Sequence, residues 1–319
     1  MTVSCSRWLN LSGLWALILA VACTPTPSWE THPDRYKEGE TFGFRKWLDP
    51  EVDPDVVIIG IHGFSGASVD YDNLGKYLLK HQPETALYAY ELRGQGSDPI
   101  HQRRGDIGQA EEWYRDLHAF TRLVRERHPQ AKVVWYGESM GALISVHALC
   151  QAEQDDAPCD ALVLSSAIVR FRDDIPHWVP GLVRVAAKAL PEERITLETL
   201  MQGDDVQMTQ DASHKGQAAK NPWHIDEYTL RLIGNLTRLI AGMNDCASEL
   251  HLPLLILHGG RDELNQDRDI RGFIARLPED TPVTYHHYDK AYHLLMHDRQ
   301  RKRVFQDVTQ WIDGLRSAE

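Results

Sequence analysis

The chain has 319 residues, of which 42% are apolar and 25% are charged, and its length allows one large α/β domain or two ordinary ones. This composition is typical of a globular protein and excludes a disordered or fibrous chain. Its 34 basic and 46 acidic side chains give a net charge of -12, so the protein would repel polyanions. We therefore expect no nucleic-acid partner.

The first 22 residues differ from the rest of the chain. Arg7 is their only charged residue, and residues 14–22 form an unbroken apolar run. This run fits the core of a secretory signal peptide and is too short for a transmembrane helix, which needs about 20 apolar residues. Residues 19–23 resemble a bacterial lipobox, in which cleavage before the cysteine exposes it for lipid attachment. We predict a signal peptide at 1–22 and a lipid on Cys23, with an ordinary signal peptide cut nearby as the alternative.

Residues 23–40 are predicted to form a tether. The segment 24–28 alternates threonine or serine with proline, which makes a stiff spacer of the kind that holds a domain away from a membrane. No aspartate follows Cys23, and by resemblance to bacterial lipoproteins this points to the outer membrane. The expectation is an exported, membrane-anchored lipoprotein on the periplasmic or surface face of the outer membrane.

From residue 56 onward, short β-branched apolar runs alternate with helical patterns. This alternation is typical of a mostly parallel sheet with helices on both faces, so we predict an α/β fold. Strands are predicted at 56–61, 85–92, 132–136, 161–164, 252–257 and 283–288. Helices are predicted at 109–128, at 142–149 and near the C-terminus.

The long segment between the strands at 161–164 and 252–257 has the pattern of helices, with apolar clusters at 178–190 and 223–243. A simple crossover between two strands needs far fewer residues, so we predict an inserted helical cap or lid. The α/β core then comprises residues 41–167 and 251–319, and the cap comprises 168–250. The alternative is a set of ordinary helices that cover the sheet.

A G-x-S-x-G pentapeptide at 137–141 lies between a predicted strand and a predicted helix. In a nucleophile elbow, the serine occupies a strained strand-to-helix turn, and the flanking glycines avoid clashes with the neighbouring backbone. The start of the helix then directs its free N–H groups at the reacting carbonyl. This context predicts Ser139 as a nucleophile, and the alternative is a turn whose serine only caps the helix.

A serine hydroxyl is a weak nucleophile at neutral pH and needs a base that is oriented by a carboxylate. In folds with such an elbow, the acid and then the histidine follow the serine in the chain. Asp262 and His293 each follow a predicted strand, at the edge of the sheet where catalytic groups belong. Asp262 is therefore the predicted acid and His293 the predicted base, with Glu263 and Asp267 as alternative acids.

The tetrahedral intermediate of such a reaction needs N–H donors where its negative charge develops. The backbone N–H of Met140, next to the nucleophile, is one predicted donor. The other is the N–H of Phe64, in the loop 62–66 that follows the strand at 56–61. The alternative for this loop is a simple glycine turn.

Three cysteines follow the tether: Cys150, Cys159 and Cys246. An exported protein experiences an oxidising compartment, and Cys150 and Cys159 flank a short polar loop. We predict a structural disulfide between these two, and buried free thiols are the alternative, because spacing alone does not establish the required geometry.

Five short motifs stand out along the chain. They are HG at 62–63, ELRGQGS at 91–97, GESMG at 137–141, HGGRD at 258–262 and AYHLL at 291–295. Together they resemble the monoacylglycerol lipase and lysophospholipase branch of the α/β-hydrolases, which is sometimes grouped with the serine aminopeptidase-like hydrolases. The resemblance covers residues 40–316.

The resemblance implies an α/β-hydrolase fold whose helical cap, inserted between strands 6 and 7, shapes an acyl-chain tunnel. It implies a triad at the positions of Ser139, Asp262 and His293. Gln95 stands where the family often has histidine, a change that we expect to leave catalysis unaffected.

The function expected from the resemblance is a serine esterase that acts on a lipid-like ester, such as a monoacylglycerol or a lysophospholipid, through an acyl-enzyme on Ser139. No metal or organic cofactor is implied, and no feature of the sequence predicts an oligomeric state. Three activities with the same triad remain open: thioesterase, amidase and carbon–carbon hydrolase. A non-catalytic, surface-anchored binding module is the alternative from another class, whereas an aspartate-nucleophile enzyme is disfavoured by the serine at the elbow.

Overall fold

The structure is a computed structural model that describes residues 28–33, 41–152, 158–196, 199, 206–211 and 223–317. The predicted signal peptide, Cys23 and most of the tether lie outside the described residues, so these remain predictions. Among the described residues, no helix is both long enough and apolar enough to span a membrane.

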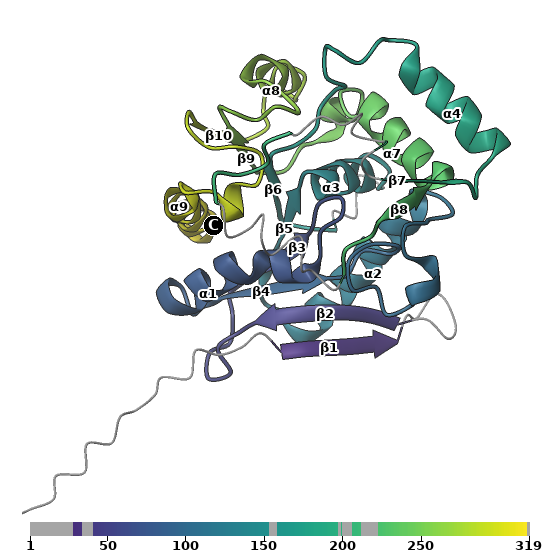
Figure 1. The fold of residues 1–319 in the computed structure, drawn as a ribbon. Helices are drawn as coiled ribbons and strands as arrows, with labels where there is room; N and C mark the ends of the chain where they lie inside the picture. The colour runs from purple at the N-terminus through teal and green to yellow at the C-terminus, as the bar shows by residue number, and fades with distance from the viewer. Residues whose placement is uncertain are drawn as a thin grey trace, which may run out of the picture.

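An eight-stranded sheet runs through the centre of the protein in the order β1-β2-β4-β3-β5-β6-β9-β10 (Figure 1). Strands β1 and β2 are antiparallel to their neighbours, and all other pairs in this sheet are parallel. The strands are β1 (Ser28–Pro33), β2 (Thr41–Trp47), β3 (Val56–Ile61), β4 (Thr85–Tyr90), β5 (Lys132–Glu138), β6 (Ala161–Ser165), β9 (Leu254–Gly259) and β10 (Val283–Tyr288). The predicted mostly parallel sheet is confirmed.

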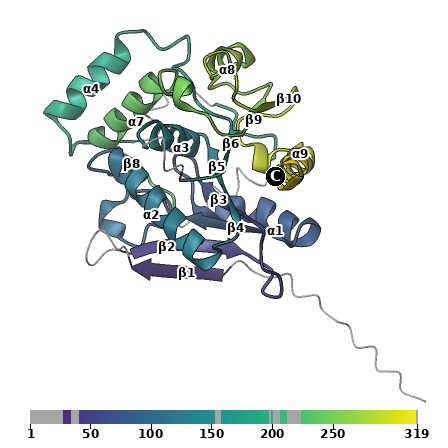
Figure 2. The same ribbon diagram turned by 180° about the vertical axis from the view of Figure 1, so that it is seen from behind.

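Helices cover both faces of the sheet, because successive side chains of a buried strand point to opposite faces. On β3, Val57 and Ile59 pack in the cluster that includes residues of α2 (Glu111–Arg127) and α3 (Met140–Cys150). Val56 and Ile58 pack in the opposite cluster, with residues of α1 (Asp72–His81) and α9 (Arg301–Ser317). Figure 2 shows the same layers from behind. One further helix, α8 (Asp267–Ile274), lies between β9 and β10 in the chain.

Strand β1 corrects part of the predicted tether. It pairs with β2 from Ser28 opposite Lys46 to Pro33 opposite Thr41. Glu30 in its middle forms ion pairs with Lys46 and Arg127. A polar edge strand carries no alternating apolar pattern, so its sequence resembles a spacer, and only its pairing partner reveals it.

The segment between β6 and β9 contains the helices predicted for the cap. These helices are α4 (Val179–Ala189) and α7 (Leu230–Gly242), and they pack on each other. A 3-10 turn, Cys246–Glu249, follows α7. Two short strands, β7 (Arg194–Thr196) and β8 (Glu227–Thr229), form a separate antiparallel pair that the sequence analysis did not predict. In Figure 1, α7 lies next to α3, and α4 lies on the outer side of α7.

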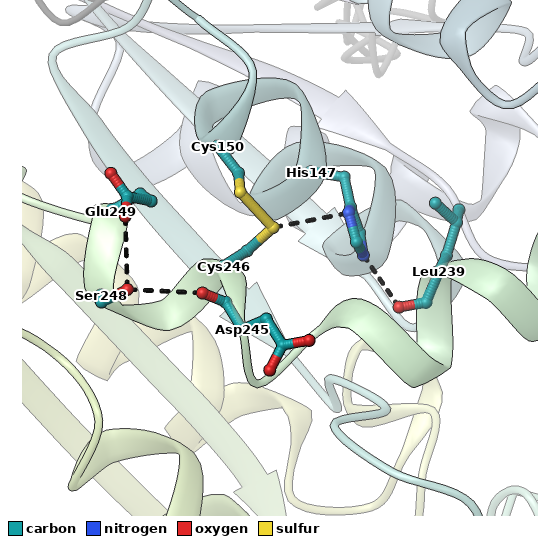
Figure 3. The surroundings of a disulfide bond; sticks show 7 residues. All are labelled: His147, Cys150, Leu239, Asp245, Cys246, Ser248 and Glu249. Atoms are coloured by element: carbon teal, nitrogen blue, oxygen red, sulfur yellow. Dashed lines mark hydrogen bonds between the residues drawn. A yellow bond between two sulfur atoms is a disulfide. The ribbon is translucent and has the colours of Figure 1, made fainter.

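The disulfide joins Cys150 to Cys246, so the predicted pairing of Cys150 with Cys159 is wrong (Figure 3). The Cα atoms of Cys150 and Cys246 are 5.4 Å apart, because the C-terminal end of α3 packs against the 3-10 turn. Cys159 stands just before β6 and is buried as a free thiol in the core. Closeness along the chain suggested one partner, and the packing of distant elements selects another.

We expect the double variant Cys150→Ala/Cys246→Ala to lose about 3–5 kcal/mol of unfolding free energy, because the bond closes a long loop. The two cysteines are 96 residues apart in the chain. Guanidinium unfolding followed by circular dichroism measures the loss.

Cys159→Ala is the control for this disulfide, since it removes a buried thiol without opening a crosslink. A reducing agent should destabilise the wild type and this control but not the double variant. Equal stability of the double variant and the wild type would contradict the prediction.

Candidate active site

Ser139 occupies a strained turn between β5 and α3. Its backbone has φ 53° and ψ -111°, a region that non-glycine residues rarely adopt. A Cβ atom on Gly141 would lie 1.8 Å from the carbonyl oxygen of Ile61, and one on Gly137 would lie 2.6 Å from that of Gly141. Only glycine fits at these two positions, so α3 can begin directly at the edge of the sheet. This is the geometry of a nucleophile elbow.

The structure brings Ser139, His293 and Asp262 into one hydrogen-bonded row. His293 Nε2 lies 2.9 Å from Ser139 Oγ, and His293 Nδ1 lies 2.8 Å from Asp262 Oδ2. Asp262 follows β9 and His293 follows β10, while Asp262 Oδ1 accepts a hydrogen bond from the backbone N–H of Leu264 at 2.8 Å. With Nδ1–H donated to the carboxylate, Nε2 is left to accept the serine proton.

The alternative acid Asp267 serves a different purpose. Its carboxylate accepts a hydrogen bond from the hydroxyl of Tyr285 and pairs with Arg271. His258 also lies near Asp262, with its Nδ1 4.0 Å from Asp262 Oδ2. Asp262 is thus the carboxylate that the structure places against the base.

The charges of the row stabilise each other. Burial lowers the pKa of His293, but the charge and the hydrogen bond of Asp262 outweigh burial and hold that pKa above its ordinary value. Burial raises the pKa of Asp262, and the adjacent His293 reverses this and holds it below its ordinary value. Asp262 is therefore ionised at neutral pH, where it stabilises the imidazolium that forms when Ser139 gives up its proton.

The loop after β3 passes beside the nucleophile. A Cβ atom on Gly63 would lie 3.4 Å from the Cβ of Ser139, so the backbone that leads to Phe64 is close to the reacting hydroxyl. The ring of Phe64 packs on Tyr228 of β8, with ring centroids 4.4 Å apart. Met140, the other predicted donor, is the first residue of α3 and is buried.

Two contacts of this loop were absent from the sequence analysis. The Tyr228 hydroxyl shares a hydrogen bond with Ser65 Oγ, so a residue of the segment between β6 and β9 touches the loop. Gln95 Oε1 accepts a hydrogen bond from the backbone N–H of Ser65 at 3.1 Å. No sequence pattern predicts the contact of Tyr228, because this residue lies far from residues 62–66 along the chain. Gln95, by contrast, stands inside the motif at 91–97.

Two further carboxyl groups, those of buried Glu138 and half-buried Asp70, lie near the elbow. Glu138 directly precedes the nucleophile, and its Oε1 is buried without a hydrogen-bond partner. Burial, together with the charge of Asp70, raises the pKa of Glu138 to about 8. Burial also raises the pKa of Asp70 to about 7. Around pH 6 both groups are therefore mainly neutral, which limits the negative charge next to Ser139. Among the described residues, no group of histidine, cysteine or acidic side chains is arranged to hold a metal ion.

Comparisons with known proteins show which family the chain resembles. The sequence profile of a family described as "Serine aminopeptidase, S33" matches residues 52–300. The monoacylglycerol lipase of Mycolicibacterium smegmatis (strain ATCC 700084 / mc(2)155) is 24% identical over 268 residues, which is 82% of this chain and 90% of that protein.

Solved structures of related shape extend the comparison. A soluble variant of monoglyceride lipase from Saccharomyces cerevisiae, in complex with a substrate analog, has a TM-score of 0.76 and 20% identity over 92% of this chain and 96% of that chain. A carboxyl esterase from Bacillus coagulans, in complex with glycerol, also has a TM-score of 0.76, with 15% identity over 91% of this chain and 99% of that chain. These likenesses confirm the α/β-hydrolase fold.

We expect an NMR titration to give His293 a pKa above 6.5, the ordinary value for histidine, because Asp262 stabilises the protonated ring. In Asp262→Asn this pKa should fall, since the charge is lost while burial remains. The rate at which a fluorophosphonate labels the protein should decline toward acid pH with the same midpoint, because a protonated imidazole cannot accept the serine proton.

Glu263→Gln is the matched control for this titration, since it removes a neighbouring carboxylate that follows Asp262 in the chain. An unchanged titration of His293 in Asp262→Asn would refute the assignment of Asp262 as its partner.

Proposed function

Because the chain belongs to the serine aminopeptidase S33 family of α/β-hydrolases and is a lipase- or esterase-like serine hydrolase, we propose that it cleaves lipid-like carboxylic esters through an acyl-enzyme on Ser139. The observation that carries the proposal is the row from Ser139 Oγ to His293 at 2.9 Å and on to Asp262 at 2.8 Å. A non-catalytic binding module would have no need to bury and align these three groups.

In the proposed reaction, Ser139 Oγ attacks the ester carbonyl while His293 Nε2 takes its proton. The oxyanion of the tetrahedral intermediate is stabilised by the backbone N–H groups of Met140 and Phe64, and loss of one such donor costs about 3–4 kcal/mol in comparable enzymes. His293 then gives the proton to the leaving alcohol, and the acyl group stays on Ser139. Water, deprotonated by His293, attacks the acyl-enzyme, and the carboxylic acid leaves as His293 returns the proton to Ser139 Oγ.

We infer that the substrate is a monoacylglycerol, a lysophospholipid or a similar ester with one acyl chain. Two relatives are named as a monoacylglycerol lipase and a monoglyceride lipase, the latter bound to a substrate analog. Helix α4 of the cap and its flanks expose large apolar side chains, and exposed apolar surface of this kind marks contact with lipid, ligand or protein. These side chains are Trp178, Leu182, Val185 and Leu190.

We also propose that the protein is exported and anchored through a lipid on Cys23, in the outer membrane. The lipobox-like run that ends at Cys23 supports this anchor. Strand β1 begins at Ser28, only five residues after Cys23. A chain of that length spans at most about 18 Å, so the lipid would keep the edge of the sheet close to the membrane.

A fluorophosphonate probe should label the wild type and fail to label Ser139→Ala, because the probe reacts only with an activated serine. Ser248→Ala, which changes an exposed serine, is the control and should label normally. An unlabelled wild type, or a Ser139→Ala variant that labels as well as the wild type, would defeat the proposed chemistry.

The same preparations should be tested on esters of graded chain length, thioesters and amides. We expect the highest kcat/KM on monoacylglycerol or lysophospholipid esters, with Ser139→Ala inactive on all of them. A clear preference for thioesters or amides would replace the ester assignment while the triad stays in place.

Mass analysis of the N-terminus tests the anchor. We expect the mature chain to begin at Cys23 and to carry the added mass of attached acyl chains, and Cys23→Ala should abolish this modification. An unmodified terminus at another residue would remove the anchor without affecting the enzyme assignment.

A further inference from the structure

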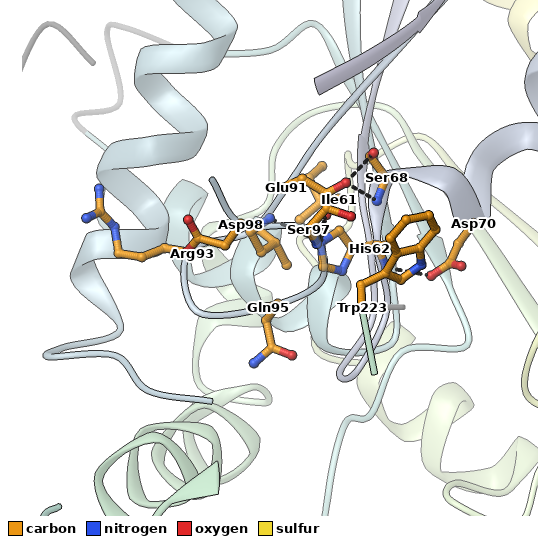
Figure 4. Close-up of polar contacts among 12 residues, drawn as sticks. Ile61, His62, Ser68, Asp70, Glu91, Arg93, Gln95, Ser97, Asp98 and Trp223 are labelled. Carbon is orange, nitrogen blue, oxygen red and sulfur yellow. Dashed lines mark hydrogen bonds and ion pairs between the residues drawn. The ribbon is translucent and has the colours of Figure 1, made fainter. Parts of the chain in front are cut away.

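Two loops at the carboxyl edge of the sheet are locked together by one buried carboxylate. Glu91, which follows β4, accepts hydrogen bonds from the backbone N–H and the hydroxyl of Ser68 at 3.2 and 2.5 Å. It also accepts the backbone N–H of Ser97 at 2.9 Å (Figure 4). Ser68 begins the 3-10 helix Ser68–Tyr71 that directly follows the loop of Phe64, and Ser97 belongs to the loop after β4. Glu91 thus fixes the position of these two segments relative to each other.

Further contacts make this junction tight. His62 Nδ1–H donates to the carbonyl oxygen of Gly63 at 2.9 Å, and His62 Nε2 accepts the backbone N–H of Leu92 at 3.1 Å. Gly96 has a positive φ of 46°, and a Cβ atom there would lie 2.8 Å from the carbonyl oxygen of Gly66. The path of the loop past Ser139 therefore depends on the loop after β4.

Arg45 of β2 supplies the counter-charge for this carboxylate. Its Nη1 lies 3.0 Å from Glu91 Oε1 and also donates to the hydroxyl of Ser68. The side chain of Glu91 is 0% exposed and that of Arg45 is 13% exposed. His62 is the other basic side chain near Glu91, at 3.8 Å, but burial lowers its pKa, so it is mainly neutral. A buried carboxylate that loses its counter-charge destabilises its surroundings strongly.

Two indole rings from distant parts of the chain hold the guanidinium of Arg45. Its Cζ lies 4.8 Å from the ring centroid of Trp29 and 5.4 Å from that of Trp223. Trp29 is the cross-strand partner of Arg45 on β1, and its ring lies over Gly43, where a Cβ atom would come within 2.4 Å of the ring. Trp223 belongs to the segment that leads into β8. The rings shield Arg45 from water and restrict its plane.

We propose that Arg45 is a positioning residue: clamped by Trp29 and Trp223, it fixes Glu91 and thereby the loop that carries Phe64 beside Ser139. The clamp couples the docking of β1, and of the segment that enters β8, to the rate of the chemical step. This role rests on the proposed function, because it acts through the oxyanion donors.

The test uses the full chain and a soluble short-chain p-nitrophenyl ester. Trp29→Ala should lower kcat about tenfold and change KM by less than about twofold, since the oxyanion donors act mainly in the transition state. Trp29→Phe keeps a ring over the guanidinium and should recover most of kcat. Arg45→Lys keeps the charge but loses the planar face, so it should lower kcat in the same way.

A double-mutant cycle tests whether the two residues act together. In the Arg45→Lys background, Trp29→Ala should cause little further loss, because the stacking of a planar guanidinium on this ring is already absent. Arg303→Ala is the matched control: Arg303 also lies over a ring, 5.6 Å from the centroid of Tyr288, but on α9. It should leave kcat unchanged.

Hydrogen exchange gives a readout that does not need activity. In Trp29→Ala, the amides of residues 62–68 should exchange faster, while those of α9 stay as in the wild type. Unchanged exchange in this segment would overturn the proposal, and so would additive losses in the cycle or a kcat of Trp29→Ala equal to that of the wild type.

If Trp29→Ala fails to fold, Trp223→Ala replaces it. This variant removes the other ring and must meet the same criteria. A wild type that hydrolyses no ester would refute the proposed function. The exchange experiment would still decide whether the clamp of Trp29 and Trp223 on Arg45 holds the loop.

Discussion

The close approach of helix α3 to strand β3 is the constraint on which the site depends. With only hydrogens on the Cα of Gly141, the helix can begin against the carbonyl of Ile61, where any side chain would collide. The chain must therefore turn sharply between β5 and α3, and Ser139 takes the strained conformation at that turn. Its hydroxyl is raised above the edge of the sheet, within hydrogen-bond distance of His293, which the loop after β10 delivers.

The carboxyl groups around this turn differ in charge because their partners differ. Asp262 faces an imidazole and stays ionised. Glu138 and Asp70 have no cation so close, and burial moves their pKa values up to about 8 and about 7. One edge of the sheet therefore holds both charged and mainly neutral carboxyl groups, and each state follows from the local partners.

Sequence patterns succeeded where a local signal and the long-range structure agree. The buried strands around β3 and β5 are short apolar runs, and GESMG lies at the point where a strand gives way to a helix. Patterns failed for β1, whose polar residues carry no periodic signal, and for Cys159, which is close to Cys150 in the chain but faces the core. In both cases the deciding contact comes from an element distant in the sequence.

The sequence by itself determined which residues could do the chemistry: a serine at an elbow, an acid after one strand and a histidine after another, in a fixed order. Strand-to-helix turns and post-strand loops are local features, so short patterns encode them. Only the tertiary structure decided that Cys246 is the disulfide partner, that Tyr228 of β8 touches the loop of Phe64, and that two tryptophans meet at Arg45. These contacts depend on how the layers pack, and packing is a property of the whole chain that no short pattern contains.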